Sequence, residues 1–219
     1  MEMFEEFLKQ FRIVHFDKGE IVLRQHEVPT AAYVIKEGVV KTYNITAEGD
    51  EKPLSFDVKN EIFPVSWLFS KADTTLHYYE AFTACELYVI PKDAYQEFMS
   101  QNPDTVYKIL GNFIGNHVGY MLQVHALEQS KASEKLLYTL HYLCIRFGKL
   151  VNAAEVKIQL PLTQQELANF MGVTRETTAI ELKKLEKSGI ISYQRASYSV
   201  NTAKLNELLD EEYGSELML

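Results

Sequence analysis

The stretch from residue 162 to residue 193 constrains the fold more than any other part of the chain, because its capping residues, glycines and apolar spacing agree. Thr163 and Glu166 have the spacing of a capping box, which begins a helix. Gly172 permits the left-handed backbone that ends this helix, and Thr174 is a good N-cap for the next one. The pattern predicts two short helices joined by a tight turn.

The second of these helices begins with Thr174-Arg175-Glu176-Thr177, which places an arginine and a carboxylate in its first turn. A DNA-reading helix needs such side chains there, because its N-terminal residues contact base edges in the major groove. Gly189 ends the helix, and the runs 190–193 and 198–200 predict a small hairpin, the wing of a winged helix-turn-helix. The alternative is an ordinary helical hairpin whose charges are merely solvated.

The first hundred residues predict a different kind of domain. Short apolar runs alternate there with turn signals such as Asp17-Lys18-Gly19 and Ala47-Glu48-Gly49-Asp50, which favours a β-sandwich or barrel. Short helices are expected before it, over 3–11, and after it, over 92–101. The expected strands lie at 21–23, 32–35, 39–40, 42–45, 54–56, 79–82 and 87–90.

A long helix is predicted from Asn102-Pro103-Asp104 to about Ser130, because its apolar residues step by four and three. Such a heptad seam is typical of a dimer helix. A helix that packs only on its own domain is the alternative. The predicted dimer-interface residues are Val106, Leu110, Phe113, His117, Tyr120, Val124 and Leu127.

Three glycines, Gly111, Gly115 and Gly119, recur beside that seam. Each costs roughly 1 kcal/mol in a helix interior. Their spacing predicts a close backbone approach, either to the partner helix or to the β-rich unit, and chance with local packing is the alternative. Further helices are expected over 132–147 and 202–212, with a strand over 156–160.

The net charge of −8 disfavours a DNA-binding protein at first sight, but the acidity lies outside the predicted DNA-binding part. Residues 163–200 contain five basic and four acidic side chains. Phosphate contacts also come from backbone N–H groups and hydroxyls. The weak basicity therefore predicts modest non-specific affinity for DNA.

Several protein classes are disfavoured by composition. No apolar run reaches the roughly 18 residues that a membrane helix needs, and the start Met-Glu-Met-Phe-Glu-Glu does not have the pattern of a secretion signal. Cys85 and Cys144 form no metal-binding pattern. We expect a cytoplasmic protein with reduced thiols, no metal site and no membrane partner.

The order of β-roll, long helix and winged helix is similar to that of the cyclic-AMP receptor protein/Fnr family of bacterial transcription regulators. The resemblance covers nearly the whole chain. It is most specific in Gln165-Glu166-Leu167-Ala168, in Gly172-Val173-Thr174-Arg175-Glu176-Thr177 and in Leu182-Lys183-Lys184-Leu185-Glu186. Asn102-Pro103-Asp104 and Thr83-Ala84-Cys85-Glu86 also match.

The resemblance implies an α+β fold in three parts. A cyclic-nucleotide-binding-like antiparallel β-roll would span 1–102, a long dimerisation helix 103–130, and a winged helix-turn-helix domain 131–219.

Carried over by position, the resemblance implies that Arg175 bonds guanine O6 and N7 and that Glu176 accepts from a cytosine amine, each worth ~1–3 kcal/mol of discrimination. The family often has a second arginine one turn further on, where this chain has Ile180, which offers only methyl contacts. The half-site is expected to resemble the family's TGTGA type, with at least one position relaxed or altered. The predicted DNA-binding residues are Thr163, Gln164, Gln165, Thr174, Arg175, Glu176, Thr177, Thr178 and Lys183.

The sensory domain departs from the family at the positions that hold a cyclic nucleotide. The glutamate-bearing opening falls on Pro64-Val65-Ser66, the Arg-Ser pair on Thr75-Leu76, and the adenine-contacting pair on Tyr120-Met121. No cation remains there for the phosphate, and a buried phosphate without a charged partner is heavily penalised. We therefore expect no cyclic-nucleotide binding.

Other sensors of the family also lack their residues. An iron–sulfur cluster needs several cysteines, mostly near the N-terminus, and none precedes Cys85. Both cysteines lie in apolar contexts that indicate inert sulfur, so we expect neither a thiol sensor nor a cofactor. Nothing singles out a haem ligand among His15, His26, His77, His117 and His125.

An aromatic-rich region remains in the β-roll, formed by Phe63, Trp67, Phe69, Tyr78, Tyr79 and Phe82. Aromatic residues at such positions most often belong to a core. Two sharper hypotheses stay open: the rings fill the former nucleotide cavity and hold the dimer DNA-competent without ligand, or they line a pocket for a different, less charged effector. The candidate effector-binding residues are Trp67, Tyr78, Tyr79 and Tyr120.

These patterns predict a sequence-specific transcription regulator that binds a near-palindromic operator in double-stranded DNA as a homodimer. RNA polymerase is a further expected partner if the protein activates. The alternatives are a regulator gated by another small molecule, and a sensor or scaffold that uses the winged helix for protein contacts. An enzyme is disfavoured, because the sequence has no His-x-His with a spaced carboxylate, no nucleophile elbow and no phosphate loop.

Overall fold

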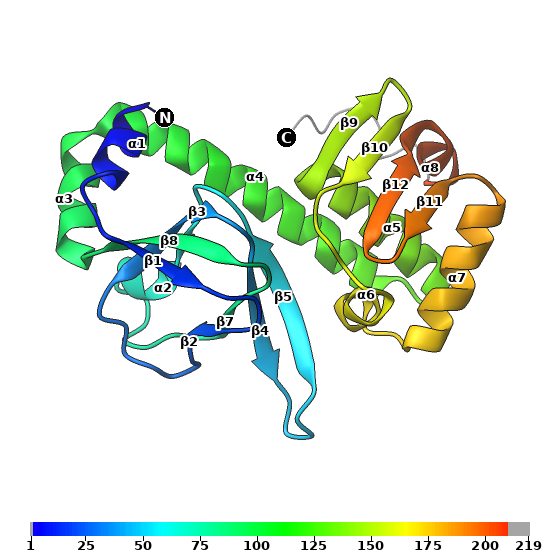
Figure 1. The fold of residues 1–219 in the computed structure, drawn as a ribbon, viewed down its shortest axis with the longest axis horizontal. Coiled ribbons are helices and arrows are strands. Elements are labelled where there is room, and N and C mark those ends of the chain that lie inside the picture. The colour runs from blue at the N-terminus through cyan, green and yellow to red at the C-terminus, as the bar shows by residue number, and fades with distance from the viewer. Residues whose placement is uncertain (1, 210–219) are drawn as a thin grey trace. The chain divides into compact units, whose positions relative to one another are not determined.

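The computed structural model describes residues 2–209, which form two compact units that divide between Gly111 and Asn112 (Figure 1). The long helix α4 (Pro103–Glu128) contributes to both units. Each unit has its own sheets and its own core, and each is described by itself.

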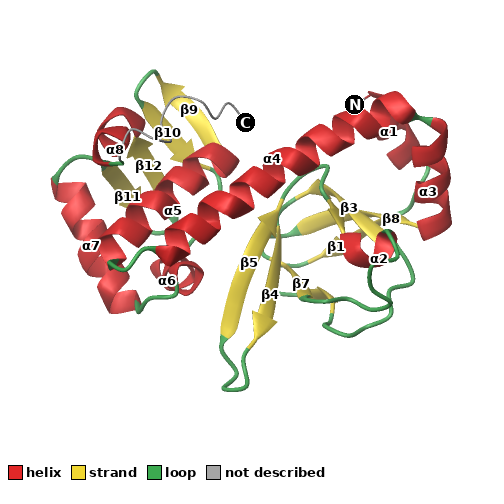
Figure 2. Ribbon diagram, turned by 180° about the vertical axis from the view of Figure 1, so that it is seen from behind, coloured by secondary structure: helices red, strands yellow, loops and turns green. Residues whose placement is uncertain are grey.

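The first unit is built from two antiparallel four-stranded sheets, which confirms the predicted β-roll. One sheet has the order β1 (Ile13–Phe16), β8 (Cys85–Ile90), β3 (Ala32–Glu37) and β6 (Ile62–Phe63). The other has the order β2 (Ile21–Leu23), β7 (Tyr78–Ala81), β4 (Val40–Ile45) and β5 (Glu51–Asp57). The hairpin of β4 and β5 projects from this unit (Figures 1 and 2).

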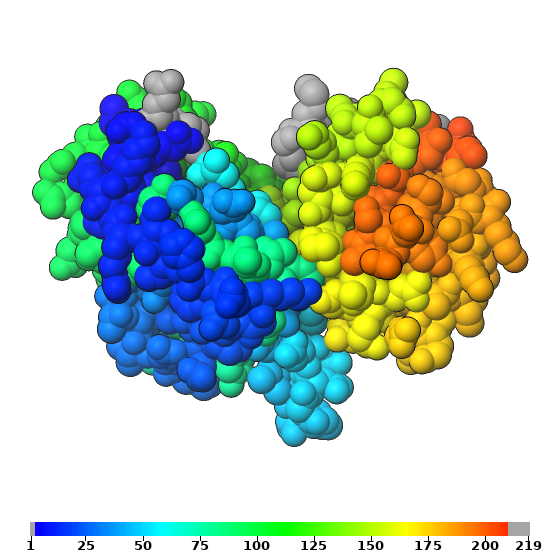
Figure 3. All heavy atoms as spheres, in the orientation of Figure 1, coloured from blue at the N-terminus to red at the C-terminus, as the bar shows by residue number. Residues whose placement is uncertain are grey.

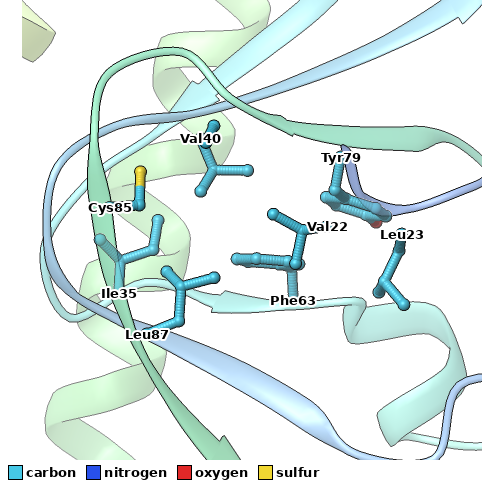
Figure 4. Close-up of a cluster of buried hydrophobic side chains, with 9 residues drawn as sticks. Val22, Leu23, Ile35, Val40, Phe63, Tyr79, Cys85 and Leu87 are labelled. Atoms are coloured by element: carbon cyan, nitrogen blue, oxygen red, sulfur yellow. The ribbon is translucent and has the colours of Figure 1, made fainter. Parts of the chain in front are cut away.

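The core of the β-roll is apolar and aromatic, and both sheets contribute to it (Figure 4). Phe63 lies at its centre between two other rings. It stacks on Tyr79 with ring centroids 4.8 Å apart and on Tyr33 with centroids 5.6 Å apart. Burying a large aromatic or aliphatic side chain of this kind contributes about 1.5–3 kcal/mol. The other buried members of this cluster are Val22, Leu23, Ile35, Val40, Ala81, Cys85 and Leu87.

A second cluster packs helices against the same unit. Phe4 and Phe7 of α1 (Glu2–Leu8) contact Phe98 of α3 (Lys92–Gln101), and the rings of Phe7 and Phe98 stack with centroids 4.1 Å apart. The apolar spacing of α1 therefore serves burial. A four-residue helix, α2 (Val65–Leu68), follows β6 directly.

The second unit is a winged helix-turn-helix, as predicted. Helices α6 (Gln164–Met171) and α7 (Arg175–Lys187) are followed by the hairpin of β11 (Ile191–Gln194) and β12 (Ser197–Asn201). That hairpin belongs to a four-stranded sheet of order β11-β12-β10-β9. Its remaining elements are α5 (Ala132–Phe147), β9 (Gly148–Asn152), β10 (Glu155–Ile158) and α8 (Thr202–Leu208).

The sequence patterns miss three strands. β1, β6 and β9 are absent from the predicted strands, and the runs 39–40 and 42–45 form the single strand β4. The predicted end of the last helix, at 210–212, lies outside the described residues. The expectation of a close backbone approach beside the seam stays a prediction, and within the second unit the nearest neighbour of Gly119 is a side chain. A methyl group there would lie 2.9 Å from Cδ of Arg146 on α5, while one at Gly111 meets open space.

Candidate nucleic-acid interface

Helix α6 begins at the predicted capping box and ends at the predicted left-handed glycine. The backbone N–H of Glu166 donates to the Thr163 hydroxyl at 3.2 Å, and the backbone N–H of Thr163 donates to the Glu166 carboxylate at 2.6 Å. Gly172 follows the helix with φ 65°, in the left-handed region that favours glycine. Leu167 and Phe170 bury the opposite face of α6. The turn therefore sets the start of α7 with little freedom.

Helix α7 presents its first turn to solvent. The Thr174 hydroxyl caps the helix by accepting from the backbone N–H of Thr177 at 3.2 Å. Arg175 and Glu176 are exposed, and neither side chain pairs with any other part of the chain that the structure describes. An unpaired guanidinium and carboxylate at a helix N-terminus are free to bond base edges.

The exposed side of α7 carries a straight line of side chains. Glu176, Ile180, Lys183 and Lys187 are all exposed and follow one another at spacings of four, three and four residues, which places them on one face of the helix. Leu182 lies on the opposite face and is fully buried. We call the first four the outward line of α7. The surface of this helix is orange in Figure 3.

The other predicted DNA-binding residues differ in their exposure to solvent. Thr163 and Gln165 are exposed, and the Gln165 amide donates to Asn169 at 2.8 Å. Gln164 and Thr177 are half-buried.

The prediction that Thr178 contacts DNA is wrong. Its side chain is 1% exposed, and its hydroxyl donates to the carbonyl of Thr174 at 3.0 Å. The helical phase turns this residue toward the core of the second unit.

The tip of the wing adds a cation that the predicted set leaves out. Gln194 pairs with Ser197, so the hairpin turns through Arg195 and Ala196. Arg195 is exposed and has φ 55°. Its place in a two-residue turn between two apolar strands is a sequence signal for an exposed tip.

The predicted seam of α4 is exposed along most of its length. Six of its seven residues are classed as exposed, and only Val106 is half-buried. The apolar face is also wider than the seam, because Tyr107, Ile114 and Met121 are exposed beside it, Tyr107 to 80%. Sequence reasoning missed this second stripe, although it repeats every seven residues. A contiguous apolar face of this size marks an interaction surface.

The position aligned with the family's phosphate-binding arginine points into the β-roll. Thr75 is fully buried, and its hydroxyl donates to the carbonyl of Arg24. In the same unit, the Thr42 hydroxyl of β4 donates to the Asp57 carboxylate of β5 at 2.8 Å. The position aligned with the arginine is therefore filled by a neutral hydroxyl that is already hydrogen-bonded to the backbone.

The candidate effector residues of the first unit have different neighbours. Tyr79 belongs to the core stack with Phe63, and Tyr78 stacks on Tyr43 with centroids 5.3 Å apart. The ammonium of Lys92 lies 4.9 Å from the centre of the Trp67 ring. Tyr120 lies on α4, in the second unit.

The two thiols lie in apolar surroundings. Burial raises the pKa of Cys85, and it raises the pKa of Cys144 to about 12. A thiol with a raised pKa is a poor nucleophile and a poor redox sensor. Within residues 2–209, no group of three or more His, Cys, Asp or Glu side chains is placed to hold a metal ion, and no helix is both long and apolar enough to span a bilayer.

Comparison with known proteins matches both halves of the chain. The sequence model of the cyclic nucleotide-binding domain matches residues 13–102, and that of the Crp-like helix-turn-helix domain matches residues 134–208. The chain is 28% identical over 192 residues to the HTH-type transcriptional regulator ArcR of Staphylococcus haemolyticus, covering 84% of this chain and 83% of the relative.

One further relative matches in sequence, and one solved structure matches in fold. The nitrogen fixation regulation protein FixK of Bradyrhizobium diazoefficiens is 25% identical over 187 residues, which cover 85% of this chain and 77% of that protein. The structure of FixK2 from Bradyrhizobium japonicum has the same fold, with a TM-score of 0.74 at 17% identity, covering 90% of this chain and 96% of that one.

Proposed function

Because the chain belongs to the cyclic-AMP receptor protein/Fnr family of DNA-binding transcription regulators, we propose that it binds a near-palindromic operator as a homodimer and needs no cyclic nucleotide to do so. The observation that carries this proposal is the exposed, unpaired Arg175 and Glu176 at the capped start of α7. In the dimer, two such helices enter successive major grooves about 34 Å apart.

The apolar face of α4 supports the dimer. Leu110, Phe113 and Val124 of the seam each expose at least two fifths of their surface. Side chains of this size are normally buried, and a second copy of the same helix offers a matching apolar face. The stripe of Tyr107, Ile114 and Met121 widens the interface that the seam alone would form.

The interior of the β-roll supports regulation without a cyclic nucleotide. The stacked rings of Tyr33, Phe63 and Tyr79 occupy the core, and the neutral Thr75 offers a phosphate no positive charge. Of the two hypotheses for the aromatic residues, these contacts favour a filled interior over an effector pocket. The protein then binds DNA without any added small molecule.

Selection of bound DNA from a random pool, with purified and dialysed protein, tests the proposal. We expect a symmetric site whose half-sites carry a G·C pair read by Arg175 and a C·G pair read by Glu176. Selection that succeeds only when metabolite extract is added would favour an effector-gated regulator instead. Binding to random DNA that lacks both sequence preference and salt dependence would favour a protein-binding scaffold.

The expected location, the expectation of no catalytic site and the expected protein partner follow from the role of a transcription regulator. A regulator of this kind works in the cytoplasm, where bacterial DNA lies, and carries no catalytic site. When it activates transcription, its partner is RNA polymerase.

A further inference from the structure

We propose that Ile180 reads the 5-methyl group of a thymine in each half-site. The inference rests on the proposed DNA-binding function and adds a specificity-determining residue to it. Ile180 lies in the outward line of α7, between Glu176 and Lys183, and its side chain is 55% exposed.

Ile180 is the apolar member of an otherwise charged line. The other members of the outward line, Glu176, Lys183 and Lys187, are all charged, and the core side of α7 is supplied by Thr178 and Leu182. More than half of the Ile180 side chain is therefore open to solvent. In the proposed complex the outward line of α7 faces the major groove, so this apolar side chain meets base edges there.

The shape of isoleucine suits a rigid contact. A β-branched side chain in a helix adopts essentially one χ1 rotamer, so its methyl groups are held in place before DNA arrives. Little side-chain entropy is lost on binding, in contrast to the long arginine that the family often has at this position.

The chemistry of the major groove selects the partner. Guanine, adenine and cytosine present only hydrogen-bonding groups there, while thymine also presents its C5-methyl group. An isoleucine cannot satisfy those donors and acceptors and would leave them desolvated. Contact between isoleucine and a methyl group is favourable instead, so Ile180 is expected to prefer a 5-methylpyrimidine.

The helical spacing limits where the thymine lies. Ile180 is four residues beyond Glu176, which is about 6 Å along the helix axis. Base pairs follow one another every ~3.4 Å along the duplex. The thymine is therefore expected within two base pairs of the pair that Glu176 reads.

Replacing thymine by uracil removes only the methyl group and tests the inference directly. Using the full-length protein and its selected operator, each thymine of one half-site is replaced in turn, and the dissociation constant is measured. One buried methyl group is worth about 0.8 kcal/mol, which is a roughly fourfold loss of affinity at one position. Uracil at the other thymines serves as the control and leaves affinity unchanged.

Two variants assign the effect to the residue. Ile180→Ala is expected to bind the thymine and uracil operators equally, while Ile180→Val keeps most of the preference. Both substitutions lie on the surface, and circular dichroism checks their folding. At the same position, 5-methylcytosine is compared with cytosine: tighter binding of 5-methylcytosine supports the methyl contact, and equal binding of the two counts against it.

The outcomes keep the inference separate from the proposed function. A specific operator at which uracil equals thymine everywhere would overturn the role of Ile180 and leave DNA recognition standing. A uracil effect that persists in Ile180→Ala would also overturn it. The absence of any preferred operator would overturn both.

Discussion

The backbone N–H of Glu27 donates to the Thr75 hydroxyl at 3.1 Å, and the backbone N–H of Thr75 donates to the Glu27 carbonyl at 2.9 Å. Thr75 thus ties two loops of the β-roll together from a fully buried position. This is the position at which the family's nucleotide-binding members place an arginine. Its side chain here has a structural role and supplies no positive charge.

The protein is therefore expected to bind neither cyclic AMP nor cyclic GMP. A phosphate buried beside Thr75 would lose its hydration without gaining a cation. Titration calorimetry with both nucleotides is expected to give no heat of binding, and adding either nucleotide is expected to leave operator affinity unchanged. Micromolar binding of either one contradicts this prediction.

Arg175→Ala is expected to abolish the preference for guanine at the base pair that Arg175 reads while leaving the dimer intact. The guanidinium is exposed and lies at the start of α7, so its removal costs a base contact without disturbing the core. We expect a loss of about 1–3 kcal/mol of discrimination at one base pair of each half-site. Footprinting measures it, with Lys71→Ala, an exposed cation of the first unit, as the control. Unchanged footprints from Arg175→Ala refute the assignment.

Phe113→Glu is expected to dissociate the dimer. Phe113 lies in the exposed seam of α4, and two carboxylates brought together in an apolar interface are strongly unfavourable. Light scattering coupled to size-exclusion chromatography gives the mass. Lys108→Glu, which changes an exposed residue of the same helix outside both apolar stripes, is the matched control. A Phe113→Glu protein that remains dimeric shows that another surface forms the interface.

Two glycine substitutions are expected to differ in cost. A methyl group at Gly172 meets nothing within 4 Å, so Gly172→Ala loses only the left-handed preference of glycine, about 1–2 kcal/mol. At Gly38, with φ 95°, the added carbon would lie 2.3 Å from the carbonyl oxygen of Ala84. Urea denaturation should show a larger loss of unfolding free energy for Gly38→Ala. Equal losses would mean that the backbone at Gly38 yields easily.

Stability is expected to fall as the pH drops below about 6.5, the ordinary pKa of a histidine side chain. Burial lowers the pKa of His141, and among the described residues its Nε2 has no hydrogen-bond partner. In mildly acidic solution His141 therefore binds a proton in the unfolded chain but stays neutral in the folded chain. The slope for one histidine is at most about 1.4 kcal/mol per pH unit, and solvent screening at this half-buried site reduces it.

Unfolding free energies measured at about pH 7.5 and about pH 5.5 test this dependence. The loss on acidification is expected to shrink in His141→Gln and to persist in His26→Asn, where the histidine is exposed. His77, whose pKa burial also lowers, contributes with the same sign and accounts for part of the remaining loss. If the unfolding free energy of His141→Gln depends on pH as strongly as that of the unchanged protein, His141 does not cause the dependence.

The parts of the fold that the sequence predicts are those held by local signals. The capping box of Thr163 and Glu166 and the left-handed Gly172 act within a few residues, so α6 and α7 begin and end as predicted. Strand β9 is different. All five of its residues are exposed, so it has no apolar alternation, and only its pairing with β10 makes it a strand.

In the candidate site, too, local signals are predicted from the sequence and burial is not. Arg175 and Glu176 are identified by type and position at a helix start. Thr178, two residues further, belongs to the buried face, which only the helical phase reveals. The stripe of Tyr107 and Ile114 repeats with the same period as the predicted seam, so periodicity alone does not separate the two faces.

The exposed apolar face of α4 has a consequence for the cell. A chain that buries this face only against its own copy is stabilised by mass action, so its melting temperature rises with protein concentration. Diluted below the dissociation constant of the dimer, the protein would lose both half-site recognition and part of its resistance to unfolding and proteolysis. The number of copies per cell then affects how much dimer occupies the operator, in addition to any chemical signal.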